Sequence, residues 1–234
     1  MPKTMNVEIK LMGVFPVQKV VTELAELFKQ ESGHTVTAVF ATSGVIRQKV
    51  ASGEPADIII LNDNEIIELA DQGVVIANSR TNIARFGLGV VVRQGSPLPD
   101  ISTPDNLKKV LLTAKSIAYA DPLHARGGAH VATVLQRLGI TDAVKNKTIF
   151  SGGGSSTSEA VAKGEAEIGV QGMSKTILTD GTLVAGPLPH ELQKYMSLSA
   201  CVTTQSIAPE AARAFVAFLA RPSFRSIYIE DGLA

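Results

Sequence analysis

The feature that most constrains the fold is a repeated pattern along the chain. A short apolar run rich in β-branched residues is followed by a break, and then by apolar residues at helical spacing. This alternation predicts an open, mostly parallel sheet with right-handed crossovers. In the first part of the chain we expect strands at residues 7–12, 35–40 and 57–61, and helices at 17–28, 43–50 and 63–72.

The pattern restarts after a strand expected at 87–92, and the 234 residues suit two lobes of about 100 residues each. In the second part we expect helices at 107–112, 127–138 and 156–162, and strands at 116–120, 148–150 and 168–170. A return strand at 196–204 and helices at 209–219 and after Pro222 are expected to pack back on the first lobe.

These elements predict an α/β protein with two lobes. Each lobe is a mixed, mostly parallel sheet flanked by helices. Lobe 1 is expected to be discontinuous (1–84 and 199–234) and lobe 2 to span 85–198. Two chain crossings would form a hinge, with a ligand cleft between the lobes.

Composition excludes several classes of function. Lys plus Arg and Asp plus Glu number 22 each, so nothing indicates a surface for nucleic acid or an anionic membrane. No apolar run reaches the roughly 18 residues of a membrane span. The single cysteine, Cys201, is expected in a buried strand, and the four histidines lack metal-ligand spacing. We therefore expect a monomer with no metal and no cofactor.

The first residues lack a basic segment followed by an apolar region, so no signal peptide is visible. We expect a periplasmic protein if a signal peptide has been trimmed, and a cytoplasmic one otherwise.

Four loops follow predicted strands, at the sheet edge where ligands bind in open α/β folds. The loops are residues 13–16, 41–44, 121–130 and 151–158. The last three combine a helix start with Gly or Ser, and free N–H groups at helix starts attract anions. Ser43 is placed as an N-cap, so ordinary capping remains an alternative there. No P-loop or dinucleotide fingerprint is present, which disfavours nucleotides.

Arg126 lies among the glycines of the third loop, where its guanidinium could hold a carboxylate; a solvated loop arginine is the alternative. His124 and His130 flank it. Either could be a general acid or base, although a capping or surface role is the more ordinary interpretation.

At these loops the chain resembles the periplasmic molybdate-binding proteins of ABC transporters, which have the type II periplasmic binding-protein fold. The most specific similarity is Ser43-Gly44, Gln48 and then Gly53-Glu54-Pro55-Ala56-Asp57. Further similarities are Ile83-Ala84-Arg85, Asp121-Pro122 with Gly128, the run 164–169 and the ending Asp231-Gly232-Leu233.

The resemblance implies an oxyanion held by two serines, backbone amides and a tyrosine. It keeps Ser43, but Val14-Phe15-Pro16 replaces the first-loop serine and Gln171-Gly172 the tyrosine. Arg126 and His130 also depart from the family pattern. An added arginine and an apolar Phe15 favour an organic di- or tricarboxylate over a metal oxyanion. The expected ligand-binding residues are Val14, Phe15, Ser43, Gly44, Arg126, Gly127, Gly128, Gly154, Ser155, Ser156 and Gln171.

Three functions follow as hypotheses. The first is a solute-binding protein that delivers this anion to an ABC permease. The second is an isomerase similar to aconitate isomerase, with His130 or His124 moving a proton in an unsaturated polycarboxylate. The third is binding of molybdate or tungstate.

Overall fold

The computed structural model describes residues 6–153, 155–174 and 177–233. Within them the chain forms two compact units. Unit 1 combines residues up to Arg85 with those from Met196 onward, and unit 2 runs from Phe86 to Tyr195. The expected α/β class with two mixed sheets flanked by helices is confirmed.

The sheet of unit 1 has the strand order β2-β1-β3-β10-β4. β1 is parallel to β2 and β3, and β10, which comes from the carboxyl-terminal segment, runs antiparallel to β3. The strands are β1 (Glu8–Val14), β2 (Thr35–Ala41), β3 (Ile58–Asn62), β4 (Thr81–Phe86) and β10 (Met196–Val202).

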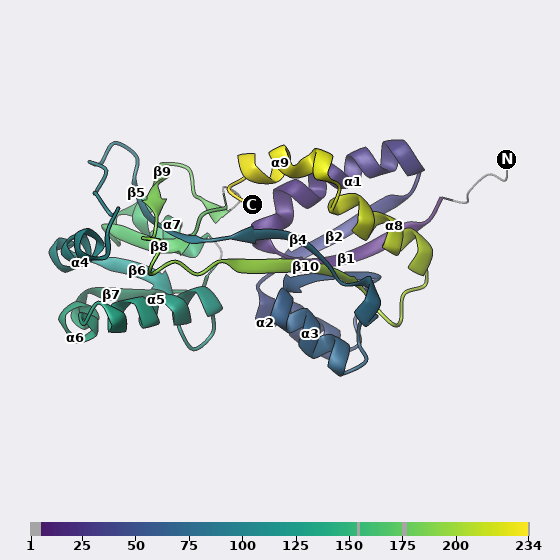
Figure 1. Cartoon of the computed structure of the whole chain (residues 1–234), viewed down its shortest axis with the longest axis horizontal. Helices are drawn as coiled ribbons and strands as arrows, with labels where there is room; N and C mark the ends of the chain where they lie inside the picture. Colours follow the sequence, from purple (N-terminus) through teal and green to yellow (C-terminus); the bar gives the residue numbers. More distant parts are fainter. Residues whose placement is uncertain (1–5, 154, 175–176, 234) are drawn as a thin grey trace. The chain divides into compact units, whose positions relative to one another are not determined.

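Helices cover both faces of this sheet. Figure 1 shows α1, α8 and α9 on one face and α2 and α3 on the other. The ring of Phe28 on α1 packs against those of Phe215 and Phe218 on α8, with centroid distances of 5.0 and 5.2 Å. The helices are α1 (Gln18–Ser32), α2 (Ser43–Ala51), α3 (Asp63–Asp71), α8 (Pro209–Leu219) and α9 (Arg225–Glu230).

A buried carboxylate ties the two chain segments of unit 1 together. Asp57 is only 2% exposed. Its carboxylate accepts from the Lys10 amide (2.8 Å), the Ser206 hydroxyl (2.6 Å) and the Ile207 amide (3.1 Å). A buried charge is tolerated when several donors satisfy it. The last residue of the Gly-Glu-Pro-Ala-Asp motif therefore has a structural role in this protein.

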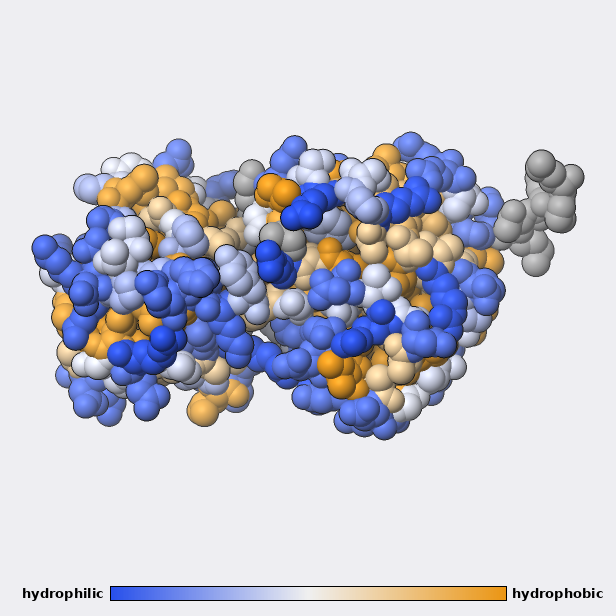
Figure 2. Space-filling model, viewed as in Figure 1, coloured by the Kyte–Doolittle hydropathy of each residue, from blue (hydrophilic) through white to orange (hydrophobic). Residues whose placement is uncertain are grey.

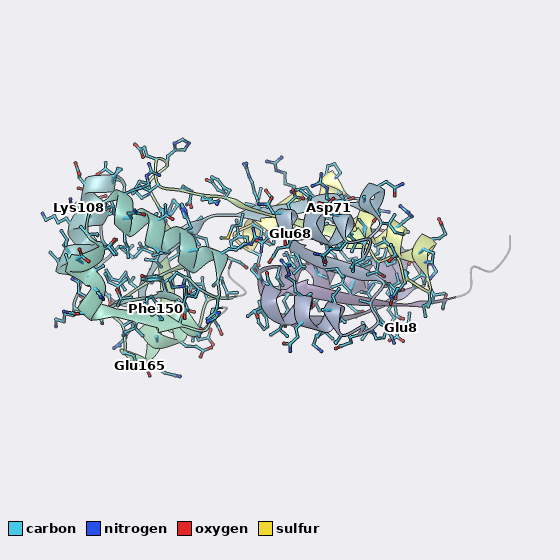
Figure 3. All side chains as sticks on the ribbon, turned by 90° about the horizontal axis from the view of Figure 1, so that it is seen from below. Glu8, Glu68, Asp71, Lys108, Phe150 and Glu165 are labelled. Atoms are coloured by element: carbon cyan, nitrogen blue, oxygen red, sulfur yellow. The ribbon has the colours of Figure 1, made fainter. Side chains whose placement is uncertain are left out.

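The sheet of unit 2 has the order β7-β6-β8-β5-β9. β6 is parallel to β7 and β8, and β5 is antiparallel to β8 and β9. Figure 3 shows the exposed Phe150 on β7, which is an edge strand of this sheet. The strands are β5 (Leu88–Arg93), β6 (Ile117–Ala120), β7 (Thr148–Ser151), β8 (Ile168–Gly172) and β9 (Thr182–Pro187).

In unit 2, α7 (Ser156–Lys163) lies on one face of the sheet and α5 (Arg126–Arg137) on the other (Figure 1). α4 (Pro104–Thr113) and α6 (Thr141–Val144) complete the unit. The Gln193 side chain holds the start of β5 as a neighbouring strand would. Its oxygen accepts from the Leu88 amide (2.9 Å), and its nitrogen donates to the Leu88 carbonyl (2.7 Å).

Candidate functional site

In unit 1 the loops predicted to carry chemistry meet at one sheet edge. Val14 pairs with Ala41 in the β1–β2 register, and Gly13 pairs with Ile60 of β3. The carboxyl ends of these three parallel strands therefore lie side by side, and the first and second loops leave from the same edge, as expected for an open α/β sheet.

The first loop presents an apolar surface. Val14 is buried at the end of β1, and Phe15 is half-buried in a 3-10 turn, Phe15–Val17, that precedes α1. Neither side chain supplies a polar donor.

The start of α2 carries backbone N–H groups that its N-cap side chain does not satisfy. The N-cap is Thr42 rather than Ser43, so our N-cap assignment was wrong by one residue. Thr42 has the extended backbone that an N-cap needs, whereas Ser43 is already helical. The Thr42 side chain makes no capping hydrogen bond, the first turn has no acidic residue, and the first helical bond runs from the Ile46 amide to the Thr42 carbonyl. The amides of Ser43 and Gly44 thus have no acceptor within the helix.

The Ser43 hydroxyl is held by Asn62, which was not among the predicted site residues. The Asn62 side-chain nitrogen donates to Ser43 Oγ (3.3 Å) and to Glu65 Oε2 (2.7 Å). Asn62 and Glu65 also form a capping box at the start of α3. The pattern Asn62-x-x-Glu65 before an apolar run is a known signal for such a box, so the sequence did contain it.

Burial separates Glu65 from the other acids of α3. Glu65 is 5% exposed, whereas Glu68 and Asp71, labelled in Figure 3, are exposed. Glu65 Oε2 accepts from the Asn62 backbone amide (3.3 Å), so it also faces the nitrogen end of the Asn62 side chain. The amide nitrogen is therefore the atom that reaches Ser43.

In unit 2 the third loop is a closed turn anchored by Asp121. Its side chain accepts from the Leu123 amide (2.9 Å), and its carbonyl accepts from the amides of His124 (3.1 Å) and Ala125 (2.9 Å). The Asp121 amide in turn donates to the Ser151 carbonyl (3.0 Å), which joins the third and fourth loops at one edge.

α5 starts directly against the end of β6. A Cβ at Gly128 would lie 1.9 Å from the Ala120 carbonyl oxygen, so only glycine fits there. The N-cap of α5 is Ala125, whose side chain cannot cap the helix, and the first turn contains no acidic residue. Arg126 is the exposed first residue of this helix, and Gly127 follows it. The helix start therefore combines backbone donors with a guanidinium.

His130 lies one helical turn after Arg126, on the same side of α5. Its Nε2 is 2.8 Å from the Leu192 carbonyl oxygen. A carbonyl only accepts, so Nε2 carries the hydrogen and Nδ1 is the atom that could take a proton. His124 is different, because its side chain is 81% exposed and its Nε2 lies 4.0 Å from Asp121 Oδ2.

The hydroxyls of the fourth loop are used inside unit 2. Ser155 donates to the Glu159 carboxylate, and Ser156 donates to the Gly153 carbonyl (2.6 Å). The hydroxyls of Thr157 and Ser151 lie 2.6 Å apart. Gly154, which we predicted in the site, lies outside the described residues. Ser155 and Ser156 would thus meet an anion through their backbone or after a change of rotamer.

Gln171 lies near the end of β8 and is 6% exposed. Its side-chain nitrogen donates to the Ile177 carbonyl (3.1 Å), which also accepts from the Ser158 hydroxyl (2.9 Å). Its side-chain oxygen has no hydrogen-bond partner among the described residues. Buried amides are usually satisfied, which makes this oxygen unusual.

In the described part of the chain, no group of three His, Cys, Asp or Glu side chains could hold a metal ion. Cys201 is fully buried in β10, as predicted, and burial raises the pKa of its thiol. None of the described helices is long and apolar enough to cross a membrane. The face shown in Figure 2 mixes hydrophilic residues with small apolar patches.

The structure therefore gathers Val14, Phe15, Ser43 and Gly44 at one edge of unit 1. It gathers Arg126, Gly127, Gly128, Ser155, Ser156 and Gln171 near the corresponding edge of unit 2. Their roles in binding stay predictions.

Comparison with known proteins finds relatives that match most of the chain. The chain is 28% identical over 221 residues to an aconitate isomerase from Pseudomonas sp, covering 91% of this chain and 82% of that protein. It is also 28% identical over 211 residues to the molybdate-binding protein ModA of Azotobacter vinelandii, covering 86% and 79%. The solved Azotobacter vinelandii periplasmic molybdate-binding protein superposes with a TM-score of 0.81 at 21% identity, over 97% of this chain and 98% of that one.

These similarities confirm the resemblance to molybdate-binding proteins and the type II periplasmic binding-protein fold. A family model described as "Bacterial extracellular solute-binding protein" matches residues 12–234, and the chain therefore belongs to that family.

Proposed function

We propose that this protein binds a small organic anion with two or three carboxylates and delivers it to an ABC permease from the periplasm. The observation that carries the proposal is the start of α5. Uncapped backbone amides, a glycine that lets the helix meet the strand end, and the Arg126 guanidinium occur together there. A guanidinium matches the planar, two-oxygen geometry of a carboxylate.

The start of α2 supports the same ligand class. It adds backbone amides and the Ser43 hydroxyl, and it has no acidic side chain in its first turn that would repel an anion. The apolar Phe15 at the same edge suits the carbon skeleton of an organic ligand better than a metal oxyanion. The molybdate-binding relatives support anion binding in general.

Isothermal titration with citrate, tricarballylate, succinate, molybdate and tungstate tests this proposal. We expect micromolar binding of at least one carboxylate and much weaker binding of the two metal oxyanions. Micromolar molybdate binding without heat from any carboxylate would contradict it.

A second function is favoured by the aconitate isomerase relative and by His130. In this mechanism Nδ1 of His130 takes a proton from the methylene carbon of aconitate, the double bond shifts, and the proton returns to the former alkene carbon. Arg126 and the start of α5 would stabilise the charge that develops on the adjacent carboxylate.

The contact to Leu192 dictates the variant for this test. His130→Ala would remove both the candidate base and a structural hydrogen bond. His130→Gln offers an amide donor for the Leu192 carbonyl but no base. Interconversion of cis- and trans-aconitate followed by NMR, present in the wild type and lost in His130→Gln while binding persists, would establish the isomerase. If the wild type does not interconvert the two isomers, the isomerase function is excluded and only the binding function remains.

A further inference from the structure

Ser43 differs from the described serines of the fourth loop in where its proton can go. Ser155 and Ser156 donate their hydroxyl hydrogens to acceptors in their own unit. Ser43 Oγ accepts a hydrogen bond from Asn62, and among the described residues it donates to none. It is half-buried at the first position of α2, next to backbone amides that also point away from the helix.

The Asn62 amide is fixed on both sides. Glu65 Oε2 accepts from its nitrogen (2.7 Å), and the capping box occupies its oxygen. If the amide rotated by half a turn, its oxygen would face the buried Glu65 side chain at Oε2. Two hydrogen-bond acceptors would then lie in contact with no hydrogen between them, which is unfavourable. The second hydrogen of the amide nitrogen is therefore directed at Ser43.

We propose that Asn62 is a positioning residue that orients the Ser43 hydroxyl as a donor and makes it selective for ligand oxygens that carry no proton. This inference rests on the proposed function. A hydroxyl that accepts one hydrogen bond becomes a stronger donor in the next, because the bonds polarise each other. The Asn62 hydrogen also excludes the orientation in which the Ser43 proton points back into unit 1.

The consequence concerns ionised and protonated ligands. A carboxylate oxygen accepts from Ser43 without competition. A protonated carboxyl can accept from Ser43 only through its carbonyl oxygen, which is a weaker acceptor than an ionised oxygen. Its hydroxyl hydrogen would meet the Ser43 proton unless that proton turned away. Removal of the Asn62 donor frees the hydroxyl to turn, so that affinity for the ionised form falls and the preference for it weakens.

The substitution Asn62→Ser tests this, because serine keeps an N-cap acceptor for α3 but cannot reach Ser43 as the amide does. Asn64→Ser, at an exposed asparagine two positions along the same helix, is the matched control. Ser43→Ala and the double variant complete a cycle. Affinities for tricarballylate and for molybdate are measured by calorimetry, and thermal unfolding checks that each variant folds.

We expect Ser43→Ala to weaken tricarballylate binding about tenfold and Asn62→Ser about fivefold, with Asn64→Ser unchanged. The double variant should bind within about twofold of Ser43→Ala, since Asn62 acts through Ser43. On lowering the pH toward the carboxyl pKa of tricarballylate, the affinity of Asn62→Ser should fall less steeply than that of the wild type. A loss of fold alone would not change this slope.

Two outcomes overturn the inference. Effects that multiply in the double variant would show that Asn62 acts independently of Ser43. Parallel pH profiles for the wild type and Asn62→Ser would show that it does not select the ionised form. If the wild type binds molybdate but not tricarballylate, the carboxylate proposal fails, and the same cycle measured with molybdate decides the role of Asn62. If it binds neither anion, both proposals fail.

Discussion

The two units have the same sheet architecture but differ in which helix start is open. α2 and α7 occupy equivalent positions. Each follows an edge strand, β2 or β7, that is parallel to its neighbour in the sheet, β1 or β6. α2 starts with a serine that keeps its proton available, whereas the serines at the start of α7 donate theirs inside the unit. A count of hydroxyls in a loop is therefore a poor measure of the donors that it offers to a ligand.

The helices that follow the central strands show the opposite distribution. α1 is preceded by the apolar turn Phe15–Val17, whereas α5 starts with Arg126 and two glycines. Unit 1 thus presents a neutral donor after its edge strand, and unit 2 presents a charged one after its central strand. Equivalent positions in the fold therefore need not carry the same kind of hydrogen-bond donor.

The largest effect is expected from Gly128→Ala. This substitution disrupts the close contact between the start of α5 and the end of β6, in the glycine-containing helix start that distinguishes α5 from α1. The new Cβ would lie 1.9 Å from a backbone oxygen, so the helix start must move. We expect the free energy of unfolding in urea to fall by at least about 2 kcal/mol, with loss of anion binding.

Gly127→Ala is the control for this change. Its Cβ would lie 3.7 Å from Leu88 Cδ2, an ordinary contact, and its stability should stay within about 1 kcal/mol of the wild type. Equal losses for both variants would show that the close approach at Gly128 is not what matters.

Arg126→Gln should weaken carboxylate binding about 10- to 100-fold, because a charge-assisted bidentate contact is lost. Arg126→Lys keeps the positive charge but loses the planar pair of N–H donors that can bind both carboxylate oxygens. Its affinity should fall between those of the wild type and the glutamine variant. Calorimetry at low and high salt checks this. An unchanged affinity in Arg126→Gln would remove the distinction between the charged start of α5 and the neutral start of α2.

The contrast between α2 and α7 is tested by alanine at one serine from each. Ser43→Ala should cost about tenfold in anion affinity, whereas Ser156→Ala should cost less than about threefold, since its hydroxyl already donates to Gly153. Ser156→Ala should instead affect thermal stability. A larger binding loss in Ser156→Ala than in Ser43→Ala would reverse the comparison.

The smallest effect is expected from Gly44→Ala. Apart from its chain neighbours and the backbone of its own helix, no atom of the described residues lies within 4 Å of a Cβ added there, and the backbone amide is kept. We expect helix stability to rise by about 0.5 kcal/mol, because alanine favours a helix more than glycine does. The anion affinity should change less than about twofold. A strong loss of affinity would show instead that the ligand packs against the Gly44 Cα.

Much of the fold was predictable because its central strands are apolar runs bounded by breakers. The run before Asn62 and the run around Val90 are examples. Two edge strands, β4 and β9, were missed. β4 includes the polar residues Asn82 and Arg85, and β9 ends in Gly186-Pro187, so neither has the pattern of a buried strand.

The site was predictable to the level of loops but not of hydrogen bonds. The sequence indicated helix starts at Ser43 and Gly127, because glycine and serine there are local signals. The Asn62 contact to Ser43 joins residues 19 positions apart, and the Leu192 contact to His130 spans 62. Such contacts depend on strand order and register, which local pattern does not specify.

The hydrogen bonds to the buried Asp57 carboxylate have a consequence for folding during synthesis on the ribosome. Two of the three donors to this carboxylate, Ser206 and Ile207, are translated long after β1 and β3. Unit 2 is continuous from Phe86 to Tyr195, whereas unit 1 is incomplete until its last strand and helices, from Met196 onward, have been synthesised. We therefore expect unit 2 to acquire its structure first during translation. The amino-terminal half of unit 1 would meanwhile remain a client for chaperones until the carboxyl-terminal segment emerges.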